Sequence, residues 1–262
     1  MLTVGVIIPA AGNSERFGKK DKLAEDFGGR PLLLRTVEFF TKREEVREII
    51  VVGPPATLSE FTAKFGPALS FHGVTIVAGS THNRWESVKC AIHLISDNVD
   101  RIAIHDAARP ALSNPLFDRL LLASSTFHAV AAAMPITGTV KRVESNSTMI
   151  GNEDAIADSI LGESTQATVS AHPVQETICR DRLWELQTPQ IFEPSLLRRA
   201  YEQENLAGVT DDAEVIEKLG EPIHLIEGDS RNIKVTTPDD LVNVKSMLGI
   251  KGERVRPVHK RF

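Results

Sequence analysis

Alternating strand and helix patterns predict an α/β fold for this chain of 262 residues. Short β-branched runs recur along the chain, and they are continuously apolar, as is typical of strands that are covered on both faces. Stretches with helical spacing separate these runs, and repeated strand–helix–strand units imply parallel strands joined by right-handed crossovers. We therefore expect a Rossmann-like, doubly wound and mostly parallel sheet, from which a β-arm projects after Pro135.

The first half of the chain supplies most of the expected sheet. Five strands are predicted at residues 4–8, 48–52, 74–77, 101–104 and 128–133. Helices are predicted between them at residues 32–41, 83–95 and 116–125. The first and last of these helices follow Pro31 and Pro115, and proline is favoured in the first turn of a helix. The middle helix places Trp85, Val88 and Ile92 on one stripe at helical spacing.

The alternation stops after Pro135. Residues 139–143 alternate polar and apolar side chains like an exposed strand, and a second extended segment at residues 174–179 can pair back on them. This predicts an arm over residues 136–180 with an enlarged polar loop at 145–172, for which a mobile loop is the alternative. Loops of this length are usually functional or disordered.

From Pro194 onward the α/β pattern returns. Helices are predicted at residues 194–204, 212–219 and after Pro238, and strands at 223–227 and 233–235. The sequence is therefore interpreted as a single domain over residues 1–250 that includes the arm, followed by a basic tail at 251–262.

Composition narrows the class of protein. The chain has 30 Lys and Arg residues against 35 Asp and Glu, and this net charge of −5 argues against a nucleic-acid partner. Its longest N-terminal apolar stretch, residues 4–11, is far shorter than the ~20 residues that cross a bilayer, and no basic segment precedes it as in a signal peptide. Cys90 and Cys179 are far apart, which excludes a disulfide framework, and we expect Cys90 to be buried on its helix. We expect a cytoplasmic protein with no membrane or nucleic-acid partner.

The loop after the first strand has the composition of a phosphate site. Small residues at 9–12 allow backbone N–H groups to approach a phosphate, and four cations follow within seven residues. Such a cluster suits a triphosphate, whereas a hydride-transfer cofactor does not require it. The loop lacks both G-x-G-x-x-G and G-x-x-x-x-G-K-[ST], and a solvated basic loop is the alternative interpretation.

Asp106 and Arg109 follow the fourth expected strand. The carboxyl ends of strands in an open parallel sheet face the ligand crevice, so we expect both residues near the first loop. A carboxylate in that position can hold Mg²⁺ that also bridges substrate phosphates. The alternative role for Asp106 is that of a helix N-cap.

Four motifs in this order resemble the 2-C-methyl-D-erythritol 4-phosphate cytidylyltransferase family of the non-mevalonate isoprenoid pathway. They are Pro9-Ala-Ala-Gly12 with Arg16 and Lys22, Ile104-His-Asp-Ala-Ala-Arg-Pro110, Leu186-Gln-Thr-Pro-Gln190 and Asn232-Ile-Lys-Val-Thr236. The resemblance covers nearly the whole chain. It implies a Mg²⁺-dependent nucleotidyltransferase in which the phosphate of the alditol attacks the α-phosphorus of CTP in line, releasing pyrophosphate. It also implies a homodimer formed through the arm.

The resemblance implies a role for each matching residue. The catalytic cations would be Arg16, Lys22, Arg180 and Lys234. The residues that contact CTP would be Pro9, Ala10, Ala11, Gly12, Gly79, Arg84, Ser87, Asp106 and Ala107, with Asp106 at the Mg²⁺. The residues around the acceptor would be Arg109, Thr139, Arg180, Thr188, Thr210 and Lys234. Because the arm exchanges between subunits in the family, Thr139 and Arg180 would serve the partner's active site.

This chain also departs from the family pattern. The family usually has Pro-Lys-Gln before an aromatic–Leu pair, whereas residues 20–24 read Lys-Asp-Lys-Leu-Ala, so Lys20 and Lys22 both remain candidates for the catalytic lysine. A ribitol 5-phosphate cytidylyltransferase is the alternative within the class. A dinucleotide-binding oxidoreductase would need the missing G-x-G-x-x-G turn, and a non-catalytic nucleotide-binding protein would not need the retained cations.

Overall fold

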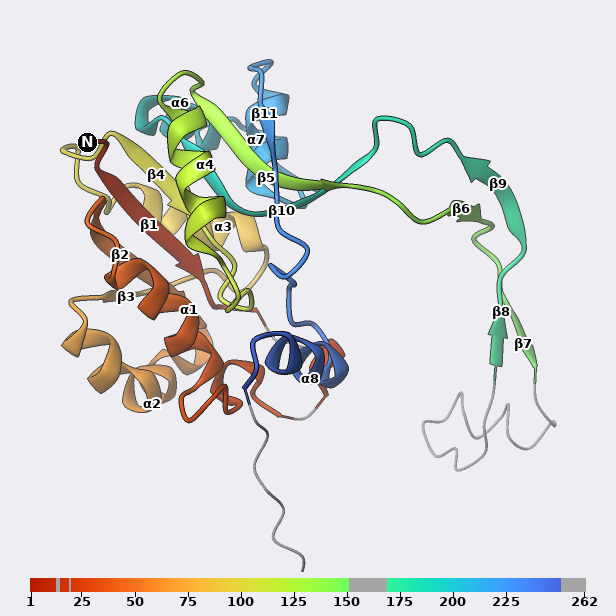
Figure 1. Ribbon diagram of the computed structural model, residues 1–262, viewed down its shortest axis with the longest axis horizontal. Coiled ribbons are helices and arrows are strands. Elements are labelled where there is room, and N and C mark those ends of the chain that lie inside the picture. Colours follow the sequence, from red (N-terminus) through yellow and green to blue (C-terminus); the bar gives the residue numbers. More distant parts are fainter. Residues whose placement is uncertain (13–14, 19, 151–168, 251–262) are drawn as a thin grey trace, which may run out of the picture. The chain divides into compact units, whose positions relative to one another are not determined.

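The computed structural model describes residues 1–12, 15–18, 20–150 and 169–250 (Figure 1). The chain divides into two compact units. One comprises Met1–Met134 together with the chain from Leu186 onward, and the other is Pro135–Glu185. The predicted basic tail lies outside the described residues. Within those residues, no helix combines the length and apolar character needed to cross a membrane.

The first unit is built on a seven-stranded sheet with the order β11-β5-β10-β4-β1-β2-β3 (Figure 1). The strands are β1 (Val4–Pro9), β2 (Val46–Gly53), β3 (Thr75–Ala78), β4 (Arg101–Ile104), β5 (Ala129–Pro135), β10 (Trp184–Phe192) and β11 (His224–Glu227). Strand β1 is parallel to both β2 and β4, with Ile7 opposite Ile50 and Ile104. Strands β2 and β3 are also parallel, as are β5 and β11, whereas β10 is antiparallel to β4. The predicted α/β class with a mostly parallel sheet is confirmed.

Helices cover both faces of this sheet. They are α1 (Leu32–Thr41), α2 (Leu58–Phe71), α3 (Arg84–Ile92), α4 (Asn114–Ser124), α6 (Pro194–Tyr201), α7 (Asp212–Lys218) and α8 (Pro238–Met247), with short 3-10 turns at η1 (Glu15–Phe17), η2 (Lys22–Ala24) and η3 (Pro55–Thr57). Successive strand side chains point to opposite faces. Ile8 therefore joins a buried cluster with Phe40 of α1, while Ile7 joins a second cluster with Ile92 of α3 and Leu197 of α6.

The second unit consists of short antiparallel strand pairs. Strand β6 (Val140–Val143) pairs with β9 (Val174–Ile178), as the sequence predicted, and β7 (Thr148–Ile150) pairs with β8 (Val169–Ala171). Part of the segment interpreted as a polar or mobile loop is therefore paired, and its centre at residues 151–168 lies outside the described residues. Each of these four strands exposes at least one large apolar side chain; they include Val143, Met149, Ile150, Val169 and Val174.

Several local expectations were wrong. Residues 233–235 form no strand, and Val235 N instead donates a single hydrogen bond to Ala108 O at 2.8 Å. Strand β10 was missed because its centre is polar and contains Pro189, and proline usually argues against a central strand. Helix α2 was missed because it contains Pro67, which normally ends a helix. Cys90 is exposed rather than buried.

Candidate active site

A cavity of about 550 Å³ opens beyond the carboxyl ends of β1, β3 and β4. This is the edge where open parallel sheets bind ligands. The cavity is lined by Pro9, Ala10, Ala11, Gly12, Arg16, Lys22, Leu23, Ser80, Thr81, His82, Asn83, Arg84, Ser87, Asp106, Ala107, Ala108, Lys234 and Thr236. The first loop and the segment after β4 therefore meet in one place, as the sequence predicted.

Close packing of small residues shapes one wall of the cavity. A Cβ atom added to Gly79 would lie 2.8 Å from Ser87 Oγ and 3.0 Å from both Ala11 Cβ and Val52 Cγ1. Only glycine therefore allows the turn after β3 to approach the first loop so closely. Ser87 Oγ in turn accepts a hydrogen bond from Ser80 N at 3.0 Å, which fixes that turn on the start of α3.

Four cations from three parts of the chain line the same cavity: Arg16, Lys22, Arg84 and Lys234. Burial lowers the pKa of Lys22, and the positive charges of Lys234 and Arg16 lower it further. Asp106 acts in the opposite direction on this pKa, but the net shift is downward. Lys20, the other candidate lysine, is exposed and is not part of the cavity wall. This concentration of positive charge is suited to polyphosphate.

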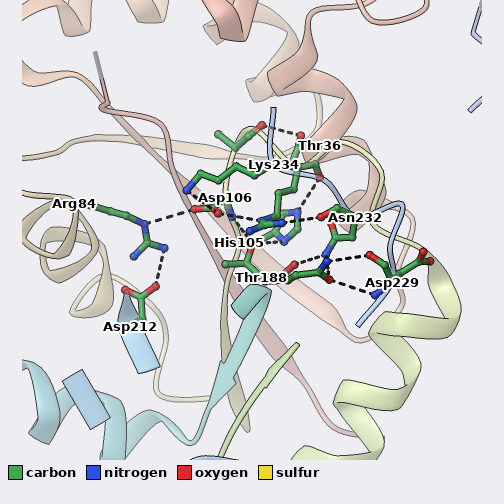
Figure 2. A network of polar contacts seen from close by, with 12 residues as sticks. Thr36, Arg84, His105, Asp106, Thr188, Asp212, Asp229, Asn232 and Lys234 are labelled. Carbon is green, nitrogen blue, oxygen red and sulfur yellow. Dashed lines mark hydrogen bonds and ion pairs between the residues drawn. The ribbon is translucent and has the colours of Figure 1, made fainter. Parts of the chain in front are cut away.

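Asp106 lies at the centre of a polar network (Figure 2). Its Oδ2 is 3.1 Å from Lys234 Nζ and 3.2 Å from Arg109 Nε, and its Oδ1 is 3.6 Å from Arg84 Nε. Burial opposes ionisation of Asp106, but the cations Arg84, Lys234 and Arg109 hold its pKa well below the ordinary value. Its backbone N donates to Thr188 Oγ1 at 2.9 Å. The Asp106 side chain is thus a fixed carboxylate among cations rather than the cap of a helix.

Arg84 is shared between two carboxylates (Figure 2). Its Nη2 is 2.7 Å from Oδ2 of Asp212, whose side chain is fully buried, and this contact is shorter than its approach to Asp106. Although burial opposes its charge, Asp212 and Asp106 raise the pKa of Arg84 above the ordinary value. The Tyr201 hydroxyl donates to Asp212 Oδ1 at 2.5 Å, and burial together with Asp212 raises the pKa of Tyr201. The cavity wall is therefore tied to α6 and α7.

Arg109 and Thr188 contact Asp106 but do not line the cavity. Arg109 Nη1 donates to Asn232 O at 2.7 Å, and Asn232 Nδ2 donates to Thr188 O at 2.7 Å. Thr188 Oγ1 is also 3.1 Å from His105 Nδ1, and His105 Nε2 is 3.0 Å from Arg109 O. Burial lowers the pKa of His105 to about 4, so this ring is neutral at pH 7. The network fixes the backbone on which Asp106 and Lys234 are carried.

Thr210, another predicted acceptor residue, does not line this cavity. Thr210 is exposed, and its hydroxyl donates to Glu214 Oε2 at 3.1 Å. Thr139 and Arg180 belong to the unit Pro135–Glu185, in which Arg180 donates a hydrogen bond to Thr137 O. Their expected role in a partner's active site stays a prediction.

The donor set around Asp106 fits Mg²⁺ only together with a nucleotide. Among the residues that the structure describes, Asp106 is the single acidic side chain in the cavity wall, and no group of three or more His, Cys, Asp or Glu residues is arranged to hold a metal ion. Mg²⁺ prefers six oxygen ligands and is commonly held by one or two carboxylates plus substrate phosphates and waters. Oδ1 of Asp106, which has the longest of the three cation contacts, is the oxygen best placed to take part.

Comparison with known proteins identifies the family. The family described as "IspD: 2-C-methyl-D-erythritol 4-phosphate cytidylyltransferase" matches residues 4–157 and 152–249. The chain belongs to the IspD family. A relative named 2-C-methyl-D-erythritol 4-phosphate cytidylyltransferase from Frankia casuarinae is 34% identical over 247 residues, which is 94% of this chain and 81% of that protein. The enzyme is accordingly a nucleotidyltransferase of the cytidylyltransferase type.

Some IspD relatives are longer than this chain. A bifunctional enzyme IspD/IspF from Desulfotalea psychrophila is 31% identical over 255 residues, and the match covers 97% of this chain and 58% of that relative. Among solved structures, the 2-C-methyl-D-erythritol 4-phosphate cytidylyltransferase from Thermus thermophilus matches with a TM-score of 0.69 and 26% identity, covering 94% of this chain and 98% of that one.

Sequence reasoning missed part of this IspD site. The cavity wall also contains Leu23, Ser80, Thr81, His82, Asn83, Ala108 and Thr236. Most of these residues adjoin a motif, and Thr236 is the last residue of the Asn-Ile-Lys-Val-Thr segment. Their proximity to the motifs could therefore have identified them as residues of the cavity wall. Asp212 and Tyr201 gave no such signal, because the contacts of Asp212 with Arg84 and of Tyr201 with Asp212 exist only after α6 and α7 pack against the sheet.

Proposed function

We propose that this protein transfers the cytidylyl group of CTP to 2-C-methyl-D-erythritol 4-phosphate, forming a CDP-alditol and pyrophosphate. IspD family membership supports the reaction and its two substrates. The observation that carries the residue assignment is the convergence of Arg16, Lys22 and Lys234 on one cavity beside the small-residue loop after β1. A ribitol 5-phosphate acceptor is the alternative, because the residues that meet CTP are the same for both reactions.

The reaction needs charge stabilisation rather than a general base. A phosphate oxygen of the acceptor forms a bond to the α-phosphorus of CTP, and the bond from that phosphorus to the oxygen bridging the β-phosphate breaks. The nucleophile is already an anion, so no proton has to be removed. The barrier lies in bringing several anions together in line, and fixed cations lower it. We assign Arg16 and Lys22 to the triphosphate and Lys234 to the acceptor phosphate.

Asp106 and Ala107 are assigned to the nucleotide side of the same cavity. We propose that Asp106 holds Mg²⁺ jointly with the phosphates of CTP. The ion would supply further neutralisation of phosphate charge. Before substrates bind, Lys234 and Arg84 neutralise Asp106, so incoming phosphates compete with this carboxylate for the same cations.

Homodimerisation through the arm is the proposed quaternary arrangement, with Thr139 and Arg180 contributing to the partner's site. The apolar side chains exposed on the strands of the second unit support it, because large exposed apolar groups commonly mark protein interfaces. A cytoplasmic location is also proposed, because the two cysteines are far apart in the sequence and form no disulfide framework.

Pyrophosphate release tests the proposal directly. CTP, UTP and ATP are each combined with 2-C-methyl-D-erythritol 4-phosphate or ribitol 5-phosphate in the presence of Mg²⁺. We expect release only with CTP and methylerythritol phosphate, and a loss of about 100-fold in Lys22→Ala, since removal of one charge-stabilising donor commonly costs 10²–10³ in rate. Lys42→Ala, at an exposed lysine outside this cavity, is the matched control. Release only with ribitol phosphate would reject the acceptor, and no release with any pair would reject catalysis.

A further inference from the structure

We infer that Asp21 and Lys64 are positioning residues that hold Lys22 in the wall of the nucleotide cavity. The inference rests on the proposed function of Lys22. Neither Asp21 nor Lys64 lines the cavity, so neither is expected to touch a substrate there. Asp21 immediately precedes Lys22, and Lys64 lies on α2, a helix that contributes no residue to the cavity wall.

Asp21 caps the turn that carries Lys22. Its Oδ1 accepts a hydrogen bond from Leu23 N at 3.1 Å, and its backbone oxygen accepts one from Ala24 N at 3.0 Å. Lys22 is the first residue of η2, a turn of only three residues, and such short turns are not stable by themselves. A side chain that satisfies a free N–H at the start of the turn therefore contributes much of its order.

Lys64 ties this cap to a rigid element. Its Nζ is 2.8 Å from Asp21 Oδ2, while Oδ1 of the same carboxylate serves the cap. The helix that carries Lys64 is anchored by Phe61 and Phe65, which are buried in the core cluster that also contains Leu23. The backbone of Lys22 is thus fixed on its N-terminal side by the Asp21 contacts and on its C-terminal side by the buried side chain of Leu23.

The charge distribution explains why Lys22 needs this support. Burial and the positive charges of Lys234 and Arg16 disfavour its ammonium group in the cavity wall, and the attraction of Asp106 offsets them only in part, so the pKa of Lys22 is lowered. A fixed backbone keeps the ammonium group near its working place before the substrates arrive. Preorganised cations stabilise a transition state without reorganising during the reaction, which is the main source of this kind of catalysis.

The backbone of Asp21 also has a conformation that proline can adopt. Its φ of −74° lies within the range of about −65 ± 15° that a proline ring enforces. Its N–H donates no hydrogen bond among the described residues. The Asp21 contacts therefore maintain, through a cap and an ion pair, a backbone conformation that a proline ring would maintain covalently. This equivalence gives the inference its most specific test.

Four single variants separate the contributions. Asp21→Ala removes the cap and the ion pair, Asp21→Asn keeps a cap acceptor without the charge, Lys64→Ala removes only the ion pair, and Asp21→Pro replaces both with a ring. The expected changes in kcat follow from the stabilisation that a helix cap and an exposed ion pair usually contribute. The value of kcat should fall about 5- to 10-fold in Asp21→Ala and about 2- to 3-fold in Asp21→Asn and Lys64→Ala. Asp21→Pro should stay within about 2-fold of the wild type. Lys64→Ala should have no effect in the Asp21→Pro background.

Competitive labelling of Lys22 with an amine-reactive reagent, followed by mass spectrometry, gives a readout that needs no turnover. In Asp21→Ala the pKa of Lys22 should return toward its ordinary value as the side chain leaves the cavity, and Asp21→Pro should restore the wild-type value. A merely structural role would lower the melting temperature without this pattern. Wild-type kcat and labelling in Asp21→Ala would overturn the inference, as would an Asp21→Pro variant as impaired as Asp21→Ala. Absence of turnover in the wild type would instead reject the proposed function, while the labelling result still decides the positioning role.

Discussion

Replacing Arg84 with methionine should destabilise the fold strongly. Asp212 is fully buried, and among the described residues Arg84 is the single cation that contacts it, at 2.7 Å; the other partner of Asp212 is the neutral Tyr201 hydroxyl. Arg84→Met has a similar volume but leaves this carboxylate charged and unpaired in the core. Breaking a buried ion pair on one side typically costs about 3–5 kcal/mol. At roughly 2–4 °C per kcal/mol for a chain of this size, the melting temperature should fall by roughly 10 °C.

Urea unfolding followed by fluorescence or circular dichroism measures this change. The double variant Arg84→Met with Asp212→Asn is the matched control, because a neutral amide can keep the Tyr201 hydrogen bond without requiring a cation. We expect the double variant to be more stable than Arg84→Met alone, a coupling that distinguishes an unpaired charge from lost packing. A loss below about 1 kcal/mol in Arg84→Met, or a double variant less stable than the single one, would contradict the role of Arg84 as the counter-ion of Asp212.

Three further predictions follow from the cavity and its surroundings. Because the pKa of Lys22 is lowered, its positive charge is lost at lower pH than for an ordinary lysine, so the alkaline fall in kcat/KM should begin at lower pH than an ordinary lysine would give, and a fall no earlier than that would contradict this. The pKa of His105 is about 4 when folded and about 6.5 when unfolded, so its contribution to stability, present above pH 6.5, should decline by about 3 kcal/mol as the pH falls to 4. Urea unfolding against pH should therefore show a steeper decline between pH 6.5 and 4 in the wild type than in His105→Gln, and equal declines would contradict this. Mn²⁺ should bind weakly to the enzyme alone and at least 10-fold more tightly with a non-hydrolysable CTP analogue, as followed by electron paramagnetic resonance, and Asp106→Asn should remove the gain.

The outline of the fold could be predicted from the sequence because the parallel strands are short, continuous apolar runs with clear breaks. Strand β10 escaped prediction because tertiary pairing with β4 overrides the polar character of its centre. The strand expected at residues 233–235 is absent, because an apolar run of this length fits a loop with a buried side chain, such as Val235, as well as a strand. Helix α2 formed despite Pro67 because Phe61 and Phe65 are buried on its inner face.

The sequence predicted the parts of the candidate site whose position depends on the order and direction of the strands. The loop after β1 and the segment after β4 converge because both strands are parallel neighbours and end at one edge. Contacts between side chains from separate elements were not predictable: Arg84 with Asp212, and Asp21 with Lys64, depend on how helices pack on the sheet. The contacts of Arg109 with Asp106 and Asn232 O were likewise not predictable, and its expected role at the acceptor phosphate stays a prediction.

The proposed reaction begins with attack by the acceptor phosphate on the α-phosphorus of CTP. This attack is tested by supplying 2-C-methyl-D-erythritol 4-phosphate whose phosphate oxygens are labelled with ¹⁸O and analysing both products by mass spectrometry and ³¹P NMR. All of the label should stay in the CDP-alditol, including its bridging oxygen, and the pyrophosphate should carry none. Label in the pyrophosphate, or a bridging oxygen that comes from CTP, would contradict the proposed attack.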